Sequence, residues 1–588
     1  MSIFTDQCGY FPNAEKRVRI TEDCKEFYLV AEDGRECFRG PAVFKGLDAE
    51  SGDNVWIGDF SSFKEGGIYR IGTDQDADSL SYPFVISEAV YDDALKKLLK
   101  AFYFLRCGTE LSDPWAEGFT HKACHLTPAM DWFDHSYSKD VRGGWHDAGD
   151  YGRYVTAGAC AVAHLLYAYQ LYPEVFNDLK PGIPEDEGQL PSILAECAVE
   201  LRWLLKMQRE DGAVWHKVTT AHHAPFVMPE EDQADLFLFA PSTMATADAA
   251  AVWALAYRIY KPFDPAFAAE MLDAAMNSYE FLNRHPEMIG FNNPPGNGTG
   301  GYGEFSDRDN RYWAAAELYC TTGEEWFRQD FIRIYKDGTL FEEHPLMKKW
   351  GIPPQSRAKR LTELGYGAVA GFGSFSYLMN DKPAMPVEEG ETLNRDPEVL
   401  KELTEAFREA AEDLVTRANE SGYGIGMKEG DYCWGSNMVL MKQGMLLAMA
   451  EAVTAQCSKE TSHDAEGQQS ASEDYFPIIT HYANYLFGEN ALGISYVSGV
   501  GENCICHPHL RPAEADGIEE CIPGMVSGGP NKRPCENDRN YVSFDAEQTP
   551  PMKCFEDLVE CFSLNEITIY WNSPAVFVLA ALMDHYKR

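Results

Sequence analysis

Hydrophobic and polar residues alternate in short runs along the first 86 positions of the chain. Residues 17–20 and 26–30 show this period of two, and turn pairs such as Asp33-Gly34 and Gly66-Gly67 separate the runs. Short alternating runs with turn residues about every 8–12 positions are typical of antiparallel strands. We therefore expect a small antiparallel β-sandwich over residues 1–86, with residues 82–87 forming its last strand and the linker.

The period changes to that of a helix after residue 90. Leu95, Leu98, Leu99, Phe102 and Leu105 recur at spacings of three and four, which predicts a helix. Further helices are expected at about 155–171, 193–207, 244–260, 266–283, 311–320, 400–418, 435–455, 474–487 and 573–586. Several of them, such as residues 157–166, are apolar on most faces, which is typical of helices inside a two-layer helical assembly.

These patterns predict a multidomain β + α protein. A single compact domain rarely reaches 588 residues, so we expect the sandwich to precede a large all-α domain over residues 87–588. Long loops rich in Gly, Pro, aromatic and charged residues connect the helices, and functional sites are usually built on such loops. The polar stretch at 458–474 is expected to be a surface insertion without chemistry.

The charge balance limits the partners of the protein. Asp and Glu number 92 against 50 Lys and Arg, a net charge of −42, and such a surface repels the phosphates of nucleic acids. No run of about 18 apolar residues occurs, so we expect no transmembrane helix and no membrane partner. Aromatic residues make up 13% of the chain, enough for a core and a binding cleft for a neutral substrate. No obligate protein partner is evident.

The N-terminus and the cysteines bear on the compartment. Residues 1–7 lack the basic region and the apolar core of a signal peptide. A cytoplasmic location is therefore expected for the chain as written, or a secreted one if a leader has been removed. Sixteen cysteines in a chain of this length do not form a dense disulfide framework. Those in apolar helical segments, Cys160, Cys197 and Cys320, are interpreted as buried thiols.

Residues 143–150, with the sequence Gly-Gly-Trp-His-Asp-Ala-Gly-Asp, form the densest charged motif. Asp147 and Asp150 could hold and activate a water molecule, one acting as base and the other orienting the water. The alternative is structural, an Asx turn followed by a helix N-cap. Far downstream, Glu566 precedes an apolar segment, where desolvation raises a carboxyl pKa as a general acid requires. Its alternative role is a cap at a helix start.

Several residues are candidates for binding a sugar. His509 and Arg511 stand two positions apart in an extended loop, where both could donate hydrogen bonds to sugar hydroxyls, or could belong to a charged surface. Trp132, Trp434 and Trp571 could stack on sugar rings, because glucose has apolar faces, or could pack in the core.

Two cysteines and two histidines are candidates for a metal site. Cys107, Cys124, His125 and His146 are a ligand set for tetrahedral zinc. The protein would fill all four positions, so the zinc would be structural, and it would pin the loop of Asp147 and Asp150 to the first helix. The alternative is a pair of buried cysteines and two unrelated histidines.

Five segments jointly resemble one enzyme family. Residues 6–13 look like an opening NQ-GY-PN segment, residues 144–151 like a GW-DAGDY loop, and residues 495–511 like a histidine signature. Residues 528–531 and 565–566 are similar to the closing motifs. In this order they resemble glycoside hydrolase family 9, the inverting cellulase family, in the branch with an N-terminal immunoglobulin-like domain. The resemblance covers nearly the whole chain.

The resemblance implies a catalytic (α/α)6 barrel that hydrolyses β-1,4-glucosidic bonds in cellulose, related β-glucans or cellodextrins, with inversion. Asp150 then corresponds to the catalytic base, Asp147 to its partner on the water, and Glu566 to the general acid. An endoglucanase is expected. An exo-acting cellodextrinase, cellobiohydrolase, β-glucosidase or exo-glucosaminidase is the alternative on the same fold. A carbohydrate-binding protein that has lost catalysis is disfavoured, because all three carboxylates are present.

The resemblance also implies binding positions. His509 and Arg511 match substrate-binding positions of the family. The positions of its structural zinc ligands are matched by Cys107, Cys124, His125 and His146. The family often binds calcium where Asp307 and Asp309 lie here. Asn310 stands where Glu is common, and a hard cation prefers several carboxylate oxygens, so the calcium site has lost one charge.

Overall fold

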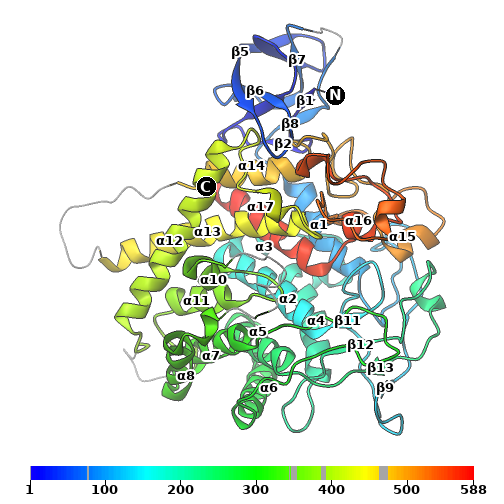
Figure 1. The fold of residues 1–588 in the computed structure, drawn as a ribbon, viewed down its shortest axis with the longest axis vertical. Helices are drawn as coiled ribbons and strands as arrows, with labels where there is room; N and C mark the ends of the chain where they lie inside the picture. Colours follow the sequence, from blue (N-terminus) through cyan, green and yellow to red (C-terminus); the bar gives the residue numbers. More distant parts are fainter. Residues whose placement is uncertain are drawn as a thin grey trace.

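The computed structural model of the protein describes residues 2–587 apart from 76–78, 343–344, 346–353, 386–391 and 462–473. Most of the polar stretch expected to be a surface insertion, residues 458–474, lies outside these described residues. Figure 1 shows a β-rich N-terminal unit set on one end of a larger helical unit.

The N-terminal unit consists of strands whose inward side chains share one core. The strands are β1 (Ile3–Phe4), β2 (Gly9–Tyr10), β3 (Arg17–Ile20), β4 (Glu26–Ala31), β5 (Glu36–Leu47), β6 (Asn54–Asp59), β7 (Gly67–Thr73) and β8 (Phe84–Ile86). Their order is β1-β3-β6-β5-β4-β7-β8-β2, and the long β5 joins the two halves because it pairs with both β6 and β4. Alternate residues such as Val18, Ile20, Phe27 and Leu29 are buried together, so the predicted alternation is confirmed.

The helical unit contains every helix that the 3.6-residue period predicts. The longer helices are α1 (Asp92–Phe104), α2 (Val155–Leu171), α4 (Ser192–Lys206), α5 (Thr243–Tyr260), α6 (Pro265–Arg284), α7 (Arg308–Thr322), α8 (Glu325–Asp337), α11 (Ala370–Met379), α12 (Pro397–Glu420), α13 (Ser436–Thr461), α14 (Phe476–Leu486) and α17 (Ile569–Lys587). The pattern does not predict α8 or α11. Gly371 and Gly373 lower the helix propensity of α11, but a Cβ at Gly373 would lie 3.0 Å from the Cα of Trp313, so the glycine permits close packing on α7.

The apolar helices contact one another in a closed order. α2 packs on α5, α5 on α7, α7 on α11, α11 on α13, α13 on α17, and α17 on α2 again. α2 and α5 are buried along nearly their whole length. The more amphipathic α1, α4, α6, α8, α12 and α14 lie against these helices from outside. The predicted two-layer helical arrangement is therefore present.

One stretch in the described part of the chain, Ser436–Cys457 of α13, has the length and composition of a membrane span. Half of that stretch is buried inside the protein, and the helix packs against α12, α14 and α17. These contacts are those of a core helix in a helical domain.

Short helices and a small sheet complete the helical unit. The short helices are α3 (Pro173–Asn177), α10 (Arg357–Thr362), α15 (Arg511–Ala515) and α16 (Phe562–Asn565). A small sheet has the strand order β10-β9-β13-β12-β11. Its strands are β9 (Ala129–Asp131), β10 (Ser138–Lys139), β11 (Arg153–Tyr154), β12 (Lys217–Thr219) and β13 (Phe237–Leu238). β11 directly precedes α2 and follows the loop of the two candidate aspartates.

The two units meet through a buried polar network. Glu489 accepts a hydrogen bond from the Tyr10 hydroxyl at 3.2 Å and forms an ion pair with Arg19 at 3.3 Å. Asp6 accepts a hydrogen bond from the Tyr91 hydroxyl at 2.8 Å. Both carboxylates are buried, and a buried charge requires such partners. The network therefore fixes how the N-terminal unit sits on the helices (Figure 1).

Candidate active site

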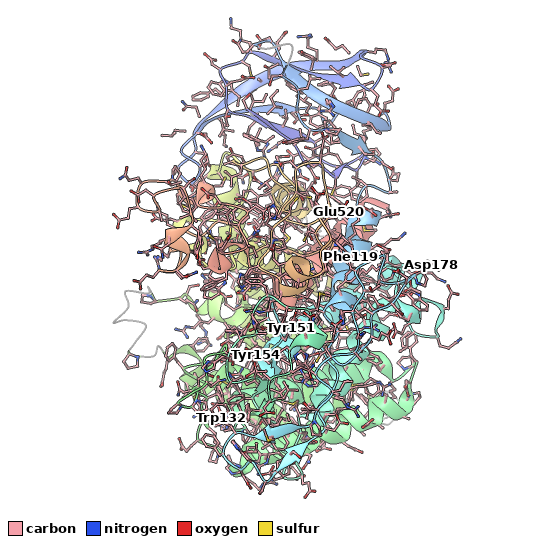
Figure 2. All side chains as sticks on the ribbon, turned by 90° about the vertical axis from the view of Figure 1, so that its right-hand side faces the viewer. Phe119, Trp132, Tyr151, Tyr154, Asp178 and Glu520 are labelled. Carbon is pink, nitrogen blue, oxygen red and sulfur yellow. The ribbon has the colours of Figure 1, made fainter. Side chains whose placement is uncertain are left out.

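One cavity of about 640 Å³ gathers the acids expected from the sequence. The candidate residues among its walls are Asp147, Asp150, Glu566, His509, Arg511, Trp434 and Trp571. They come from the segments before β11 and α13, from the start of α15 with the residues before it, and from the first turn of α17 with the residues before it. These segments are far apart in the chain. Figure 2 shows Tyr151 and Tyr154, the neighbours of Asp150 in sequence, at mid-height of the helical unit. The volume is typical of a ligand pocket, about 300–1,000 Å³.

Backbone contacts join the aspartate loop to the other segments of the site. The N–H of Ile569, at the start of α17, donates to the Asp147 carbonyl at 2.8 Å. The N–H of Arg511 donates to the Gly149 carbonyl at 3.1 Å. Glycine is required between the two aspartates, because a Cβ at Gly149 would lie 1.7 Å from the carbonyl oxygen of His509.

The structural alternative for the two aspartates is correct only in part. Oδ1 of Asp150 accepts a hydrogen bond from the N–H of Gly152 at 3.0 Å, which is an Asx-type turn. Neither aspartate caps α2, because the N-cap residue is Tyr154 and its side chain makes no capping bond. The helix-cap interpretation is therefore wrong, and both aspartates line the cavity.

Asp147 is buried beside a tyrosine. The hydroxyl of Tyr302 donates to its Oδ2 at 2.5 Å, whereas Oδ1 has no hydrogen-bond partner among the described residues. Burial raises the pKa of Asp147; the hydrogen bond from Tyr302 opposes this effect and the charge of Asp150 adds to it. A buried polar atom is costly to leave unsatisfied, so Oδ1 is the unused acceptor of this carboxyl beside the cavity.

The pKa of Asp150 is lowered, whereas that of Asp147 is raised. Its Oδ2 lies 2.6 Å from Nδ1 of His223. Burial acts to raise the pKa of Asp150, but the hydrogen bond and charge of His223, together with Arg511 and the Gly152 N–H, lower it to about 2. Asp150 is therefore ionised at neutral pH, as a general base must be.

Glu566 meets the requirement of an acid. Burial, and then the charges of Asp150 and Asp147, raise its pKa well above the usual value, and a hydrogen bond from Trp434 only partly opposes this. A parallel bridge pairs the residue with His509. Glu566 follows α16 and precedes α17, so it does not cap the start of α17. Neighbouring groups with pKa values pushed apart are typical of acid and base pairs in enzymes.

Arg511 and His509, two of the expected sugar-binding residues, already make hydrogen bonds within the protein. Arg511 is only 7% exposed, and its guanidinium donates to the carbonyls of Gly149 and Ala224 at 2.8 and 2.7 Å, so the charged-surface interpretation is wrong for it. Nδ1 of His509 lies 2.6 Å from the carbonyl oxygen of Val559. Both side chains still line the cavity.

The three tryptophans also differ in how much of each side chain is exposed and in whether it lines the cavity. Trp434 is 48% exposed and lines the cavity, whereas Trp571 is only 3% exposed and presents just part of its ring there. Trp132 packs against Phe237 and Phe239, and Figure 2 shows it well away from Tyr151 and Tyr154. Of the three, Trp434 is the most exposed side chain in the cavity wall, whereas Trp132 packs against other aromatic residues, as its core-packing alternative predicts.

The structure brings the predicted zinc ligands together beside the aspartate loop. The ligand atoms of Cys107, Cys124, His125 and His146 lie within 4.8 Å of one another, and all four residues are buried. Nδ1 of His125 has no partner in the described part of the chain, whereas its Nε2 lies 3.3 Å from a carboxylate oxygen of Asp232. A metal-bound imidazole usually turns its second nitrogen to a carboxylate. The donor set and this orphan nitrogen therefore fit zinc.

Asp307 and Asp309, the expected calcium ligands, are less favourably placed for a metal than the expected zinc ligands. Oδ2 of Asp307 accepts a hydrogen bond from Nε of Arg311 at 2.8 Å, so this carboxylate already has a buried cationic partner. Burial raises the pKa of Asp309 to about 6. Burial and the charge of Asp309 also raise the pKa values of Asp248 and Glu304, two carboxylates that the sequence pattern does not single out.

Comparison with known proteins assigns the chain to a family. The family model for glycosyl hydrolase family 9 matches residues 91–579, and the model for the cellulase N-terminal ig-like domain matches residues 1–78. The chain belongs to glycosyl hydrolase family 9. This family 9 protein is therefore an enzyme, a glycoside hydrolase of the cellulase type, with an N-terminal immunoglobulin-like domain and a large helical domain.

Relatives and solved structures match the family 9 enzyme over nearly its whole length. A cellodextrinase from Butyrivibrio fibrisolvens is 40% identical and covers 99% of this chain and 100% of its own. A thermostable endoglucanase from Alicyclobacillus acidocaldarius has a TM-score of 0.84 at 32% identity, with 99% of both chains covered. A zinc-binding triple mutant of a family 9 endoglucanase has a TM-score of 0.84 at 31% identity, covering 97% of this chain and 99% of that one.

Sequence reasoning missed two residues that touch the aspartates of this family 9 enzyme. His223 and Tyr302 lie on loops about 70 and 150 positions beyond the aspartate motif and belong to no periodic or spaced pattern. The His222-His223 doublet beside β12 is the one signal that could have indicated the first. No comparable signal marks Tyr302.

Proposed function

We propose that this enzyme hydrolyses β-1,4-glucosidic bonds in cellodextrins and related β-glucans with inversion at the anomeric carbon. The observation that carries the proposal is that the pKa values of two carboxyls in one cavity are shifted in opposite directions. The pKa of Asp150 is held low beside His223, and that of Glu566 is raised by burial. An inverting glycosidase requires one ionised and one protonated carboxyl, about 6.5–9.5 Å apart.

The reaction follows from these protonation states. Asp150 accepts a proton from a water molecule while the water oxygen attacks the anomeric carbon. Asp147 orients that water through its buried Oδ1. Glu566 gives its proton to the glycosidic oxygen as the bond to the anomeric carbon breaks. The products are a sugar of inverted configuration and the shortened chain, after which both carboxyls exchange protons with solvent.

Cellodextrins are placed first among the substrates, because the relative with 40% identity over the full length is a cellodextrinase. Endo-acting cleavage of longer β-1,4-glucans is the second candidate, since structural neighbours matching 97–99% of the chain are endoglucanases. His509, Arg511, Trp434 and part of Trp571 are proposed to contact the sugars.

We propose that residues 87–588 form an (α/α)6 barrel and residues 1–86 a separate structural domain. The closed order of α2, α5, α7, α11, α13 and α17, with a second layer of helices outside, supports the barrel. The buried contacts of Arg19 and Asp6 with the helical unit support a stabilising role for the N-terminal domain.

We also propose a structural zinc ion on Cys107, Cys124, His125 and His146. The zinc would link the end of α1 to the residue that precedes Asp147, and so would hold the aspartate loop. Calcium is the second metal proposal. Its ligands are expected to be Asp309 with Asp248 and Glu304 rather than Asp307, because Asp307 is paired with Arg311.

The product profile over time on cellohexaose and on a soluble cellulose derivative tests the function. Release of short sugars from cellohexaose, with little loss of viscosity of the polymer, is expected for a cellodextrinase. Rapid loss of viscosity with mixed products would identify the endoglucanase instead. Cleavage of neither substrate would overturn the proposal, and polarimetry or NMR of the first product tests inversion.

A further inference from the structure

Two cysteines in the segment that leads to His509 lie close enough for their thiols to interact. Cys506 is exposed and Cys504 is partly buried, whereas Ile505 between them is fully buried, so both cysteines lie on the outer side of the segment. The Cys506 thiol donates to the carbonyl of Cys504 at 3.4 Å, and the two thiols also share a hydrogen bond. The side chain of Cys506 is therefore folded back toward Cys504.

The spacing of the two cysteines limits the distance between their backbones. Two residues of fully extended chain span at most about 7 Å. The Cα atoms of a disulfide lie about 4.4–6.8 Å apart. Because Cys504 and Cys506 are separated by one residue, the segment needs little change in its backbone to bring the two sulfur atoms into bonding distance.

The surroundings of the pair disfavour thiolates. Burial, and then the charges of Cys504 and Asp557, raise the pKa of Cys506. Burial also raises the pKa of Cys521, a third cysteine nearby, and the charges of Asp557, Cys506 and Cys504 act in the same direction. A dithiol whose reduced form is stabilised, for example as a thiolate, gives a disulfide that is easily reduced. Cys506 lacks that stabilisation, which favours an uncharged disulfide.

A metal site is the other use of clustered cysteines. Across the described ranges of the chain, the group of three or more His, Cys or acidic residues whose ligand atoms lie within 4.8 Å of one another is the proposed zinc set. Cys504, Cys506 and Cys521 do not form such a group. The exposed pair is therefore better suited to oxidation than to holding a metal.

The segment of the pair also supports a residue beside the proposed acid. The N–H of Cys506 donates to Oδ2 of Asp557 at 2.6 Å, and the carbonyl of His507 accepts from Nδ2 of Asn565 at 2.6 Å. Asn565 also donates to Oδ1 of Asp557 at 2.6 Å and directly precedes Glu566. A new bond at Cys506 therefore acts on a segment whose hydrogen bonds reach the neighbour of Glu566.

We propose that Cys504 and Cys506 are an oxidation site that forms an intramolecular disulfide with a small disulfide oxidant, oxidised glutathione, and that this disulfide lowers the activity. The effect on activity rests on the proposed hydrolysis, whereas the oxidation itself does not. A disulfide that pulls Cys506 toward Cys504 disturbs the hydrogen bond to Asp557, and small displacements near a reacting group are costly for catalysis.

The chemistry is thiol–disulfide exchange in two steps. The exposed Cys506 thiol loses its proton, its sulfur attacks one sulfur of oxidised glutathione, and the first glutathione leaves as a thiolate that takes up a proton. The Cys504 thiol then loses its proton and attacks the Cys506 sulfur of the mixed disulfide, and the second glutathione leaves in the same way. The two cysteines are oxidised, and oxidised glutathione is reduced to two thiols.

Mass spectrometry of the reduced full-length enzyme after incubation with oxidised glutathione tests the site. In wild type, the peptide with Cys504 and Cys506 should lose two hydrogen atoms and resist alkylation until dithiothreitol is added. Cys504→Ser should stop at the mixed disulfide on Cys506, one glutathione heavier. The control is Cys37→Ser, because the Cys37 thiol donates to the carbonyl of Arg35 at 3.3 Å in the same arrangement but lies in β5. It should form the Cys504–Cys506 bond as wild type does.

Two results would overturn the oxidation site. One is a wild-type enzyme in which both Cys504 and Cys506 are still alkylated after the incubation. The other is a disulfide that joins Cys506 to Cys521 instead of Cys504. Both results come from wild type, so they hold even if a variant fails to fold.

Initial rates on cellohexaose test the effect on activity. Oxidised wild type should have a lower kcat that dithiothreitol restores, and Cys506→Ser should keep the same kcat before and after the incubation. An unchanged kcat in fully oxidised wild type would overturn the effect on activity. If cellohexaose is not cleaved at all, the proposed function fails, and the mass of the peptide still decides whether the oxidation site exists.

Discussion

Nε1 of Trp434 donates a hydrogen bond to Oε2 of Glu566 at 3.1 Å. This bond stabilises the ionised carboxylate, whereas burial and the charges of Asp150 and Asp147 favour the protonated form. The half-exposed indole therefore has two roles: it offers an aromatic face to the cavity, and it lowers the pKa of the proposed acid.

Replacing Trp434 by Phe should shift the basic limb of the kcat/KM profile. Loss of the donated hydrogen bond raises the pKa of Glu566 further, so the protonated acid should persist to higher pH. The matched control is Trp326→Phe, which removes an indole that donates to Glu324, the residue before α8, outside the cavity. A basic limb that stays in place in Trp434→Phe would show that the bond does not tune the acid.

Replacing Tyr302 by Phe should lower kcat while leaving the protein folded. The change removes the hydroxyl that donates to Asp147, and loss of such a buried hydrogen bond costs about 1–3 kcal/mol. If that loss falls on the transition state, kcat decreases by about tenfold or more. Tyr541→Phe, at an exposed position, is the control. An unchanged kcat would mean that Asp147 needs no such orientation.

Asp150→Asn and Glu566→Gln should each reduce kcat by at least about 10²–10⁴-fold, because each removes a proton-transfer step. Both substitutions are nearly isosteric, so melting temperatures should stay close to the wild-type value. Glu560→Gln, at an exposed carboxylate six positions before Glu566, should keep full activity. Steady-state kinetics on cellohexaose measures all three, and substantial turnover in either active-site variant would refute its assigned role.

Removing the metal with a strong chelator should lower the melting temperature more than it lowers initial kcat. The zinc would be structural, and a structural zinc contributes directly to folding. Asp232→Asn should weaken zinc affinity by about 10–100-fold, because it weakens the carboxylate partner of His125. The exposed Asp235→Asn on the same loop serves as control. Elemental analysis that finds no zinc in purified protein would contradict the site.

Breaking the junction between the two units should destabilise the whole enzyme. Arg19→Met leaves Glu489 as a buried carboxylate without its ion-pair partner, a change that costs about 3–5 kcal/mol. Deletion of residues 1–86 should likewise lower the melting temperature of the helical domain. Arg35→Met, an exposed charge in the same unit, should have little effect. A truncated protein as stable as wild type would show that the N-terminal unit is dispensable for stability.

The sequence was sufficient where local pattern decides the outcome. Alternation places Phe27 and Leu29 in the core of the N-terminal unit, because successive residues of a strand face opposite sides. The apolar run around Val155–Leu171 could only be a buried helix. The aspartate and glutamate motifs could be found because their residues are consecutive or nearly so.

Pattern was insufficient where packing overrides local preference. α11 forms although Gly371 and Gly373 disfavour a helix, because close contact with α7 compensates. Asp307 looked like a cation ligand from its charge, but the fold pairs it with Arg311, one helical turn onward. The helix-cap role for Asp150 fails because β11 intervenes before α2.

The sequence by itself determined that this protein has a strand-rich N-terminal unit, a large helical unit and the carboxyl groups for hydrolysis. Tertiary structure alone decided that the pKa of Asp150 is lowered and that of Glu566 is raised. A pKa depends on burial and on groups within a few ångströms, and here those groups are His223 for Asp150 and Trp434 for Glu566, each brought from a segment more than 70 positions away.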